Sequence, residues 1–438
     1  MRGIISDIAY EKTLIEVEIV LAKVQAQLHI IPKKAADDIA TRCTFDKLDR
    51  ARLRADMELT GLPIWGLTRQ LTEMAGAEDS GRYIHWGLNT HDIMDLAQAL
   101  QMKQALVLVG AQLNEVRDSA VTLIHTYRST PLIGRTHLQH GLPITFGYRV
   151  AVWLSSLDRH VQRLSELKSR VLLAEVGGAC GTLASMYDQQ DGRVESDAVR
   201  VTKALVRELE LYEAPIPWHA ARDGLAEVAS FLALVAGSLA KIALDVTLMQ
   251  MPEIGEVAEP FVPHRGASST MPHKNNPILC ESILACHKLS RQEAALAFEA
   301  LPADFERAGT GAWHVEWSFI PNSFMYCSSA LQHTTELLRG LRVFPENMLR
   351  NLHLSKGLVT AEHFVIALSG IHGRAKVHDI LYECCRRVHD TNQTFVDVLK
   401  EDARVTDHLS RDQINWYCDP ANYMGLTQTF IDRVLAGR

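Results

Sequence analysis

The sequence predicts an all-α protein with three helical domains and a central bundle of long helices. Five long stretches place apolar residues on wide helical faces, and the alternation typical of strands is nearly absent. At 438 residues the chain is also too long for one small core. We therefore expect an N-terminal helical domain at residues 1–93, a five-helix bundle at 94–343 and a small helical domain at 344–438.

Composition and charge indicate a globular protein that acts on small molecules. Apolar residues make up 47% of the chain and charged residues 22%. The net charge of -7 gives no basic surface for nucleic acid. The eight cysteines lack the short spacings of a zinc site or disulfide scaffold, and the N-terminus lacks the apolar core of a signal peptide. We expect a cytoplasmic protein with no nucleic-acid or membrane partner.

The first part of the chain predicts an amphipathic helix over residues 7–28. Its apolar residues recur at three- and four-residue steps, and the pattern ends before Pro32. Shorter helices follow to about residue 80.

The middle of the chain predicts the five helices of the bundle. The stretch 93–127 contains no proline and one glycine, Gly110, which favours a helix far longer than average. The apolar run 228–240 is too short to span a membrane and indicates a buried helix. The expected bundle helices cover residues 93–127, 144–175, 225–250, 278–301 and 324–341.

Polar residues gather in the segments between these helices. Asn89, Thr90 and His91 precede the first long helix, where polar side chains either cap the helix or bind an anion. A second polar loop at 134–143 holds Thr136, His137 and Gln139. His137 and His140 stand three apart, but no nearby carboxylate completes a metal site, so we expect no metal there. A histidine remains the natural proton donor at neutral pH.

The segment 265–277 combines glycine, consecutive hydroxyls and a cation before the helix at residue 278. Its composition fits either a surface connector or a catalytic loop. A hydrolase would need a G-x-S-x-G turn after a strand, which this segment lacks. Ser268 could still act as a base if a cation and backbone N–H groups stabilised its alkoxide, and Lys274 is near in sequence.

Three of these segments together resemble a known family. Residues 266–277 resemble the G-S-S-x-M-P-x-K-x-N-P signature of the fumarase/aspartase superfamily. Residues 87–92 resemble the family's first shared region, and 134–143 its second, T-H-x-Q-x-x-x-P. The resemblance extends over essentially the whole chain.

Within that superfamily the chain resembles the branch of adenylosuccinate lyase and 3-carboxy-cis,cis-muconate cycloisomerase. Segments 177–185, 311–317 and 357–362 are nearer the cycloisomerase side. The His-Asp pair usual in adenylosuccinate lyases near residues 67–73 is absent. Asn89, His91 and Asn275 also differ from the common pattern of the branch, which points to a different substrate.

The resemblance implies a cofactor-independent lyase that catalyses reversible β-elimination on a succinyl-type di- or tricarboxylate through an aci-carboxylate. Fumarate would be released by C–N or C–O cleavage. Ser268 would be the general base and His137 the general acid. Substrate binding would involve a larger set: Lys274, Asn276, Ser269, Thr90, Asn89, His91, Gln139, Thr136 and Arg265.

Three alternatives stay open at this point. They are lactonisation like that of the cycloisomerases in aromatic catabolism, adenylosuccinate lyase activity, and a helical scaffold without catalysis. The resemblance also implies a homotetramer with a twenty-helix core, in which each active site is shared between subunits. The wide apolar faces of the expected helices are consistent with such association.

Overall fold

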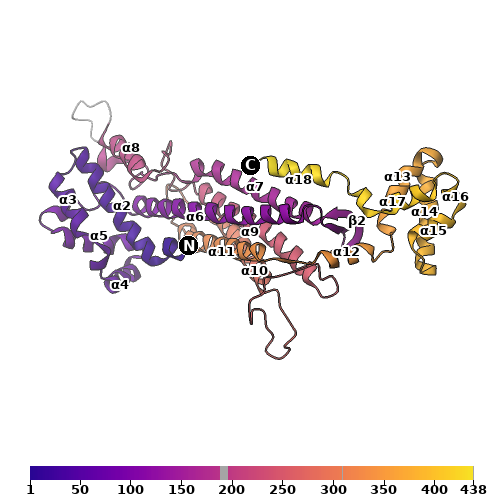
Figure 1. Ribbon diagram of the computed structural model, residues 1–438. Coiled ribbons are helices and arrows are strands. Elements are labelled where there is room, and N and C mark those ends of the chain that lie inside the picture. The colour runs from indigo at the N-terminus through magenta and orange to yellow at the C-terminus, as the bar shows by residue number, and fades with distance from the viewer. Residues whose placement is uncertain (188–195, 308, 438) are drawn as a thin grey trace. The chain divides into compact units, whose positions relative to one another are not determined.

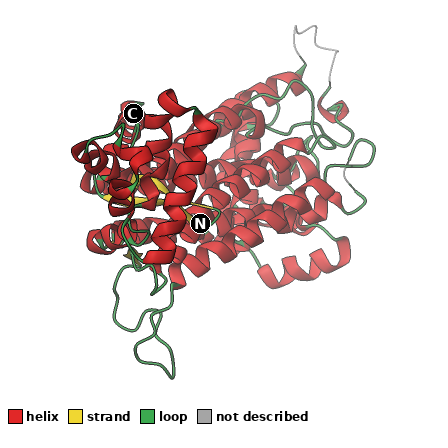
Figure 2. Cartoon of the chain, turned by 90° about the vertical axis from the view of Figure 1, so that its right-hand side faces the viewer, coloured by secondary structure: helices red, strands yellow, loops and turns green. Residues whose placement is uncertain are grey.

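The fold is all-α, as the sequence predicts. The structure is a computed structural model that describes residues 1–187, 196–307 and 309–437. Helices make up most of it, and the strands are few and short (Figure 2). The chain divides into two compact units: unit 1 contains Met1–Gln112, His160–Ala236 and Cys286–Ala330, and unit 2 contains Leu113–Arg159, Gly237–Ala285 and Leu331–Arg438.

The N-terminal helices belong to unit 1 and lie together in the indigo part of Figure 1. The helix expected at 7–28 is α2, which the Ser6 side chain caps by accepting a hydrogen bond from the Ala9 amide. The helices and 3-10 turns of unit 1 outside the bundle are α1 (Arg2–Ile5), α2 (Asp7–Gln27), α3 (Lys33–Arg42), η1 (Phe45–Lys47), α4 (Arg50–Thr60), α5 (Pro63–Ala75), η2 (Ser80–Tyr83), η3 (Ala184–Met186) and α8 (Asp197–Leu209).

The five expected long helices are present. The fifth begins twelve residues before its expected start and contains Pro321, which sequence reasoning placed outside it. A proline costs a helix one backbone hydrogen bond, a loss that the packing of so long a helix can offset. The long helices are α6 (Thr90–Tyr127), α7 (Phe146–Val171), α9 (Asp223–Gln250), α10 (Ile278–Glu299) and α11 (Ala312–Arg339).

Polar contacts join neighbouring long helices inside each unit. In unit 2 the Trp153 indole of α7 donates to Asp245 of α9 at 2.7 Å. In unit 1 the Ser328 hydroxyl of α11 donates to Gln112 of α6 at 2.9 Å. These bonds lie among mostly apolar buried side chains, so they fix which helix faces which neighbour within the bundle.

The segment expected to be a loop at 134–143 is instead part of a β-hairpin. Strand β1 (Pro131–Thr136) pairs antiparallel with β2 (Gln139–Thr145), and a second short pair joins β3 (Val257–Ala258) to β4 (Arg342–Val343). The sequence reasoning missed the hairpin because its turn, His137-Leu138, lacks the Asn-Gly or Asp-Gly that usually marks such a turn.

The C-terminal part of unit 2 is a group of short helices around Phe364 and Phe395, whose side chains are fully buried. The division into three domains stays a prediction, because each compact unit combines separate parts of the chain. The remaining elements are α12 (Pro345–His353), η4 (Leu358–Thr360), α13 (Ala361–His372), α14 (Arg374–Thr391), α15 (Phe395–Glu401), α16 (Ala403–Thr406), α17 (Arg411–Cys418), η5 (Pro420–Tyr423) and α18 (Thr427–Ala436).

Helix α9 is the one described helix whose length and hydropathy would allow it to cross a membrane. Half of its most apolar window is buried inside the protein. The core helix of a soluble protein has the same properties, so α9 by itself is weak evidence for a membrane span.

Candidate active site

The loop 265–277 of unit 2 is closed at its base by one glycine and one asparagine. The Gly266 carbonyl accepts hydrogen bonds from the backbone N–H and the side-chain amide of Asn276, both at 2.9 Å. Gly266 has a φ of +72°, and an added Cβ would lie 2.4 Å from the Asn276 carbonyl oxygen. The closure therefore requires glycine at this position.

Ser268 lies inside this closed loop with its hydroxyl facing two backbone donors. Its Oγ accepts from the amides of Thr270 at 3.3 Å and Met271 at 3.1 Å. Ser269 and Lys274 are exposed on the same loop, and the Lys274 ammonium has no ion pair within the part of the chain that the structure describes. Donors that converge on a hydroxyl oxygen stabilise its deprotonated form.

The tip of the β1–β2 hairpin brings together Thr136, His137 and Gln139. Thr136 and Gln139 are register partners, and all three residues are exposed. His137 and Leu138 form the turn with φ values of +51° and +63°. Left-handed backbone costs a non-glycine residue about 1–2 kcal/mol, and strain of this kind is often found at functional sites.

An ion pair fixes the hairpin just before its tip. The Arg135 guanidinium donates to both carboxylate oxygens of Glu256, at 2.9 and 2.6 Å. Glu256 is fully buried and also accepts from the Asn351 amide at 2.9 Å. A bidentate pair with an additional donor gives a rigid base for His137, two residues away.

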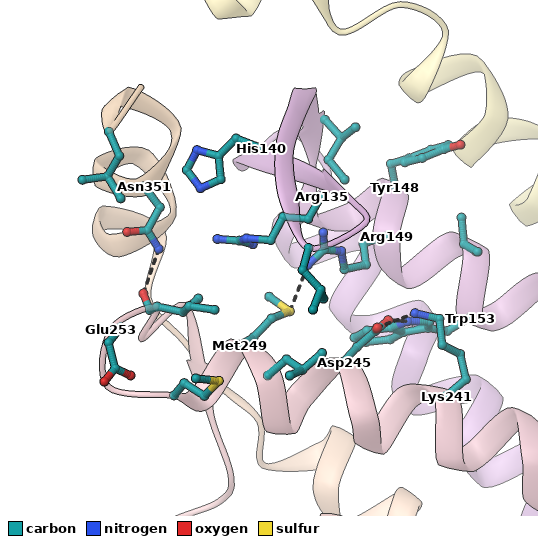
Figure 3. A pocket seen from close by; sticks show the side chains of 17 residues that line it. Arg135, His140, Tyr148, Arg149, Trp153, Lys241, Asp245, Met249, Glu253 and Asn351 are labelled. Carbon is teal, nitrogen blue, oxygen red and sulfur yellow. Dashed lines mark hydrogen bonds and ion pairs between the residues drawn. The ribbon is translucent and has the colours of Figure 1, made fainter. Parts of the chain in front are cut away.

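A cavity of about 600 Å³ lies in unit 2 beside this ion pair. Figure 3 shows Arg135 and His140 from the hairpin, Met249 from α9 and Asn351 from α12 around it. Burial lowers the pKa of the Arg149 guanidinium, which is in the cavity wall, although the charges of Asp245 and Glu256 oppose this effect. None of the predicted catalytic or binding residues lines this cavity.

In unit 1 the first polar segment forms the N-terminus of α6. Thr90 is the first helical residue, and the Asp92 carboxylate accepts from the Asn89 backbone N–H at 2.7 Å. Asp92 therefore caps the start of this helix, which is one of the two roles expected for polar side chains in this segment. The Asn89 side-chain oxygen accepts from Arg307 at 3.0 Å, while Thr90 remains partly exposed.

Two predicted binding residues, His91 and Arg265, already contact other side chains of the protein. His91 is fully buried, with its ring centroid 3.6 Å from that of Trp313 and 5.1 Å from that of His219. Burial lowers its pKa to about 3, so the ring stays neutral and is a poor ligand for a carboxylate. Arg265 forms an ion pair with Glu336 at 2.5 Å. Both ring nitrogens of His91 and Nη1 of Arg265 have no hydrogen-bond partner in the described chain, so the binding of a distal carboxylate by these side chains stays a prediction.

The sequence analysis did not predict a buried polar network that includes Asp92 at the start of α6. His219 Nε2 lies 3.1 Å from Asp92 Oδ1 and 3.4 Å from Glu175 Oε1. Arg222 donates to Asp95 at 2.7 and 3.0 Å and to Glu316 at 2.8 Å. These residues are scattered along the chain, so no local spacing indicates that they meet.

Burial controls the proton affinities of this network. It raises the pKa of Glu175 to about 8 and that of Glu316 to about 7, although Arg222 opposes the second shift. For His219, burial alone would lower the pKa, but the hydrogen bond to Asp92 and the charges of nearby carboxylates outweigh it and raise the pKa. The network thus contains groups that can change protonation near neutral pH.

Asp92, Glu175 and His219 also place three possible ligand atoms within 4.8 Å of one another. Three backbone amides already donate to the Asp92 carboxylate, and the Trp218 amide donates to Glu175 at 2.5 Å. These bonds account for most of the acceptor capacity of Asp92, whereas Glu175 Oε1 has no hydrogen-bond partner in the described chain. We interpret the group as a hydrogen-bonded network centred on Asp92.

The predicted site residues fall into three separate groups. One is the 265–277 loop and another is the hairpin tip, and no hydrogen bond or ion pair joins these two parts of unit 2 in the described residues. The third group, at the start of α6, belongs to unit 1. The joining of all three groups into one active site stays a prediction.

Comparison with known proteins gives the class of this chain. Residues 1–288 match a family model described as lyase, and residues 357–434 match one described as adenylosuccinate lyase C-terminus. These matches show that the chain is an enzyme of the lyase type.

Individual relatives narrow the assignment. The chain is 43% identical to trans-aconitate decarboxylase 1 of Mycosarcoma maydis, over 100% of this chain and 86% of the relative. It is 38% identical to 3-carboxy-cis,cis-muconate cycloisomerase of Pseudomonas aeruginosa, over 100% and 94%. The crystal structure of fumarate lyase from Mesorhizobium sp. BNC1 is 41% identical, with a TM-score of 0.91 over 100% of this chain and 97% of that one.

The chain belongs to the fumarase/aspartase superfamily, in the branch of adenylosuccinate lyase and 3-carboxy-cis,cis-muconate cycloisomerase. The resemblance found from the three sequence segments is confirmed, including its position nearer the cycloisomerases.

Proposed function

We propose that this protein catalyses reversible β-elimination on a succinyl-type di- or tricarboxylate, with fumarate released by C–N or C–O cleavage. The observation that carries the proposal is the environment of Ser268. Two loop amides donate to its Oγ within 3.3 Å, and Lys274 on the same loop has no competing ion pair in the described chain. This is what a serine needs in order to act as a general base.

In this mechanism Ser268 removes the proton next to a substrate carboxylate. The electron pair moves into that carboxylate, which becomes a dianionic aci-acid, and then expels the leaving group from the β-carbon. Lys274 and the free hydrogen of the Asn276 amide stabilise the aci-acid, because donors aimed at developing charge contribute about 2.7–4 kcal/mol each. His137 gives its proton to the leaving nitrogen or oxygen.

The other side chains of the site, which are exposed or partly exposed, orient the substrate. Thr136 and Gln139 lie on either side of His137, Ser269 follows the base, and Asn89 and Thr90 bind a second carboxylate at the N-terminus of α6, where the helix dipole favours negative charge. His91 and Arg265 are weaker candidates for a distal carboxylate, because His91 is buried and Arg265 forms an ion pair with Glu336.

A second candidate is the same addition or elimination chemistry on an unsaturated tricarboxylate. Two of the similar proteins are named for such substrates, carboxymuconate and trans-aconitate. Lactonisation of a carboxymuconate is the addition direction, in which the substrate's own carboxylate is the nucleophile. Adenylosuccinate lyase activity is a weaker candidate, because residues 67–73 lack the His-Asp pair.

The proposal includes a cofactor-independent homotetramer that acts in the cytoplasm. Large apolar side chains are exposed on unit 2, including Leu138 at 74%, Val152 at 51% and Leu244 at 46%. Exposed apolar surface of this kind marks contact sites between proteins. A tetramer in which different subunits supply the three groups of residues would complete the site.

The experiment is an assay with a panel of succinyl compounds, fumarate with amines, trans-aconitate and 3-carboxy-cis,cis-muconate, followed by ultraviolet absorbance and by chromatography of the products. Turnover of at least one compound is expected. Ser268→Ala should reduce kcat by about 10²–10⁴-fold with an unchanged circular dichroism spectrum. Near-normal turnover by this variant would rule out Ser268 as the base, and no turnover of any compound by the wild type would favour the scaffold without catalysis.

A further inference from the structure

In unit 1 the segment before α6 and the glycine-rich loop 177–183 both contact one buried carboxylate, that of Asp92. Asp92 is fully buried, and its oxygens accept from the backbone N–H groups of Gly177 at 2.8 Å and of Gly178 at 3.0 Å. The same carboxylate accepts from the Asn89 amide at 2.7 Å. Asp92 therefore joins the start of α6 to the glycine-rich loop 177–183.

His219 is a further hydrogen-bond partner of this carboxylate. Only 2% of its surface is exposed, and its Nε2 lies 3.1 Å from Asp92 Oδ1. Glu175, two residues before Gly177, lies 3.4 Å from the same nitrogen and accepts from the Trp218 amide next to His219. His219 Nδ1 has no partner in the described chain, so Nε2 is the nitrogen that acts on the network.

The backbone of the glycine-rich loop is shaped to fit the histidine. A Cβ on Gly177 would lie 2.7 Å from His219 Cε1 and 2.8 Å from Pro217. Gly178 has a φ of +68°, which turns its amide to the same carboxylate as the amide of Gly177. Both glycines are thus needed for the two amides to reach Asp92 while the ring lies against them.

An arginine joins the same two loops from their other side. Arg307 donates to the Asn89 side-chain oxygen at 3.0 Å and to the carbonyls of Gly178 at 3.3 Å and Ala179 at 2.7 Å. The segment that presents Asn89 and Thr90 is therefore connected to loop 177–183 at two points, one buried and one partly exposed. Two connections of this kind leave little freedom for the partly exposed Thr90 side chain to move.

We propose that His219 is a positioning residue which, through Asp92, holds Asn89 and Thr90 against loop 177–183 in the geometry that binds a substrate carboxylate. This inference rests on the proposed function of Asn89 and Thr90. His219 does not touch the substrate. Loss of its N–H leaves the buried Asp92 charge short of a donor, which is costly enough to let the two loops separate.

The test combines kinetics with amide hydrogen exchange. His219→Leu should raise KM for the active polycarboxylate by about tenfold or more, with a smaller change in kcat, because a misplaced carboxylate ligand weakens binding more than the chemical step. Amides of residues 87–92 and 177–183 should exchange faster. His219→Gln can still donate a hydrogen bond to Asp92 and should restore most of the lost KM and protection.

A matched control is His363→Leu in unit 2, where another mostly buried histidine has its Nδ1 3.2 Å from the Tyr417 carbonyl. This change should leave KM and the exchange of both loops unchanged. If His219→Leu does not fold, Asp92→Asn replaces it, since an amide cannot accept all of the amide hydrogen bonds that Asp92 does; the same rise in KM is expected.

Wild-type exchange provides a test that is independent of activity. The Asn89, Gly177 and Gly178 amides should be protected relative to those of Cys180 and Gly181, which have no acceptor in the described chain. Equal exchange rates would overturn the inference, as would an unchanged KM in a folded His219→Leu variant. Absence of turnover by the wild type would refute the proposed function. The hydrogen-exchange rates would then still show whether His219 and Asp92 connect the two loops.

Discussion

Ser268 and Lys274 lie on one loop and supply the hydroxyl and the cation that the proposed reaction needs. The serine has two amide donors, and the lysine has no ion pair in the described chain, so a substrate carboxylate would meet a charge that no protein group neutralises. Arg265 is less available, because its guanidinium already forms an ion pair with Glu336. The availability of a side chain, and not only its charge, decides whether it can bind a ligand.

His137 has a role that can be tested at the level of one residue. His137→Gln is expected to lower kcat by about 10²–10⁴-fold, because glutamine cannot supply a proton to the leaving group. His140→Gln is the matched control, since His140 is exposed on the same hairpin and is not part of the proposed machinery. A loss of less than about tenfold for His137→Gln in steady-state assays would exclude general-acid catalysis by His137.

Glu175 gives a prediction about pH. Burial raises its pKa to about 8, so the folded protein favours the protonated carboxyl. The resulting contribution to stability is fully present below the unfolded pKa of about 4.3 and is lost as the pH rises toward 8. The raised pKa of His219 acts in the same direction at the upper end of this range. Melting temperature should therefore fall less between about pH 5 and pH 8 in Glu175→Gln than in the wild type. A fall of equal size in both proteins would show that Glu175 remains ionised.

At the scale of elements, the closed loop 265–277 depends on Gly266. Gly266→Ala combines a left-handed residue, costing about 1–2 kcal/mol, with a contact of 2.4 Å to the Asn276 backbone that cannot relax without opening the loop. We expect kcat to fall by at least about tenfold while the melting temperature changes little, since the loop is mostly exposed.

Gly373→Ala is the matched control for that change. Gly373 has a φ of +80°, but no atom lies within 4 Å of an added Cβ. Its activity should equal that of the wild type, because the backbone change at Gly373 brings no steric contact and lies outside the loop. Equal activity of Gly266→Ala and the wild type would mean that the closure of the loop is not needed for turnover.

The hairpin shows a limit of sequence reasoning at the element scale. Leu132 and Ile133 are fully buried, but β1 is short, and the positive φ values fall on His137 and Leu138 and not on glycine or asparagine. The Arg135–Glu256 pair, formed between residues far apart in the chain, helps to hold this turn in place. Tertiary contacts thus offset a local conformation that the turn residues do not favour by themselves.

At the scale of the whole molecule, association is the main prediction. Light scattering at micromolar concentration should give a mass four times the 48.9 kDa of the chain. Leu244→Glu, on the exposed part of α9, should lower both the mass and the activity if subunits share the site. Leu59→Glu, on the exposed surface of α4, should change neither. A monomeric wild type with full activity would contradict the shared site.

The sequence by itself determined the fold class and the family. The long helices are indicated by local periodicity, and the superfamily by three short segments whose residue types are adjacent in the chain, such as Ser268 with Ser269. Chain neighbours need no tertiary information to be recognised together. The same reasoning could not place the start of α11, because Pro321 disfavours the helix locally.

Only the tertiary structure decided which polar side chains are available and which are engaged. His91 looked like a ligand in the sequence and is buried against Trp313, whereas Asp92, Glu175 and His219 form one network although the chain separates them widely. Burial and hydrogen-bond partners depend on contacts between distant segments, and single-sequence patterns carry no record of those contacts. For the same reason, the position of the hairpin turn and the closure of the serine loop by Gly266 became visible only in three dimensions.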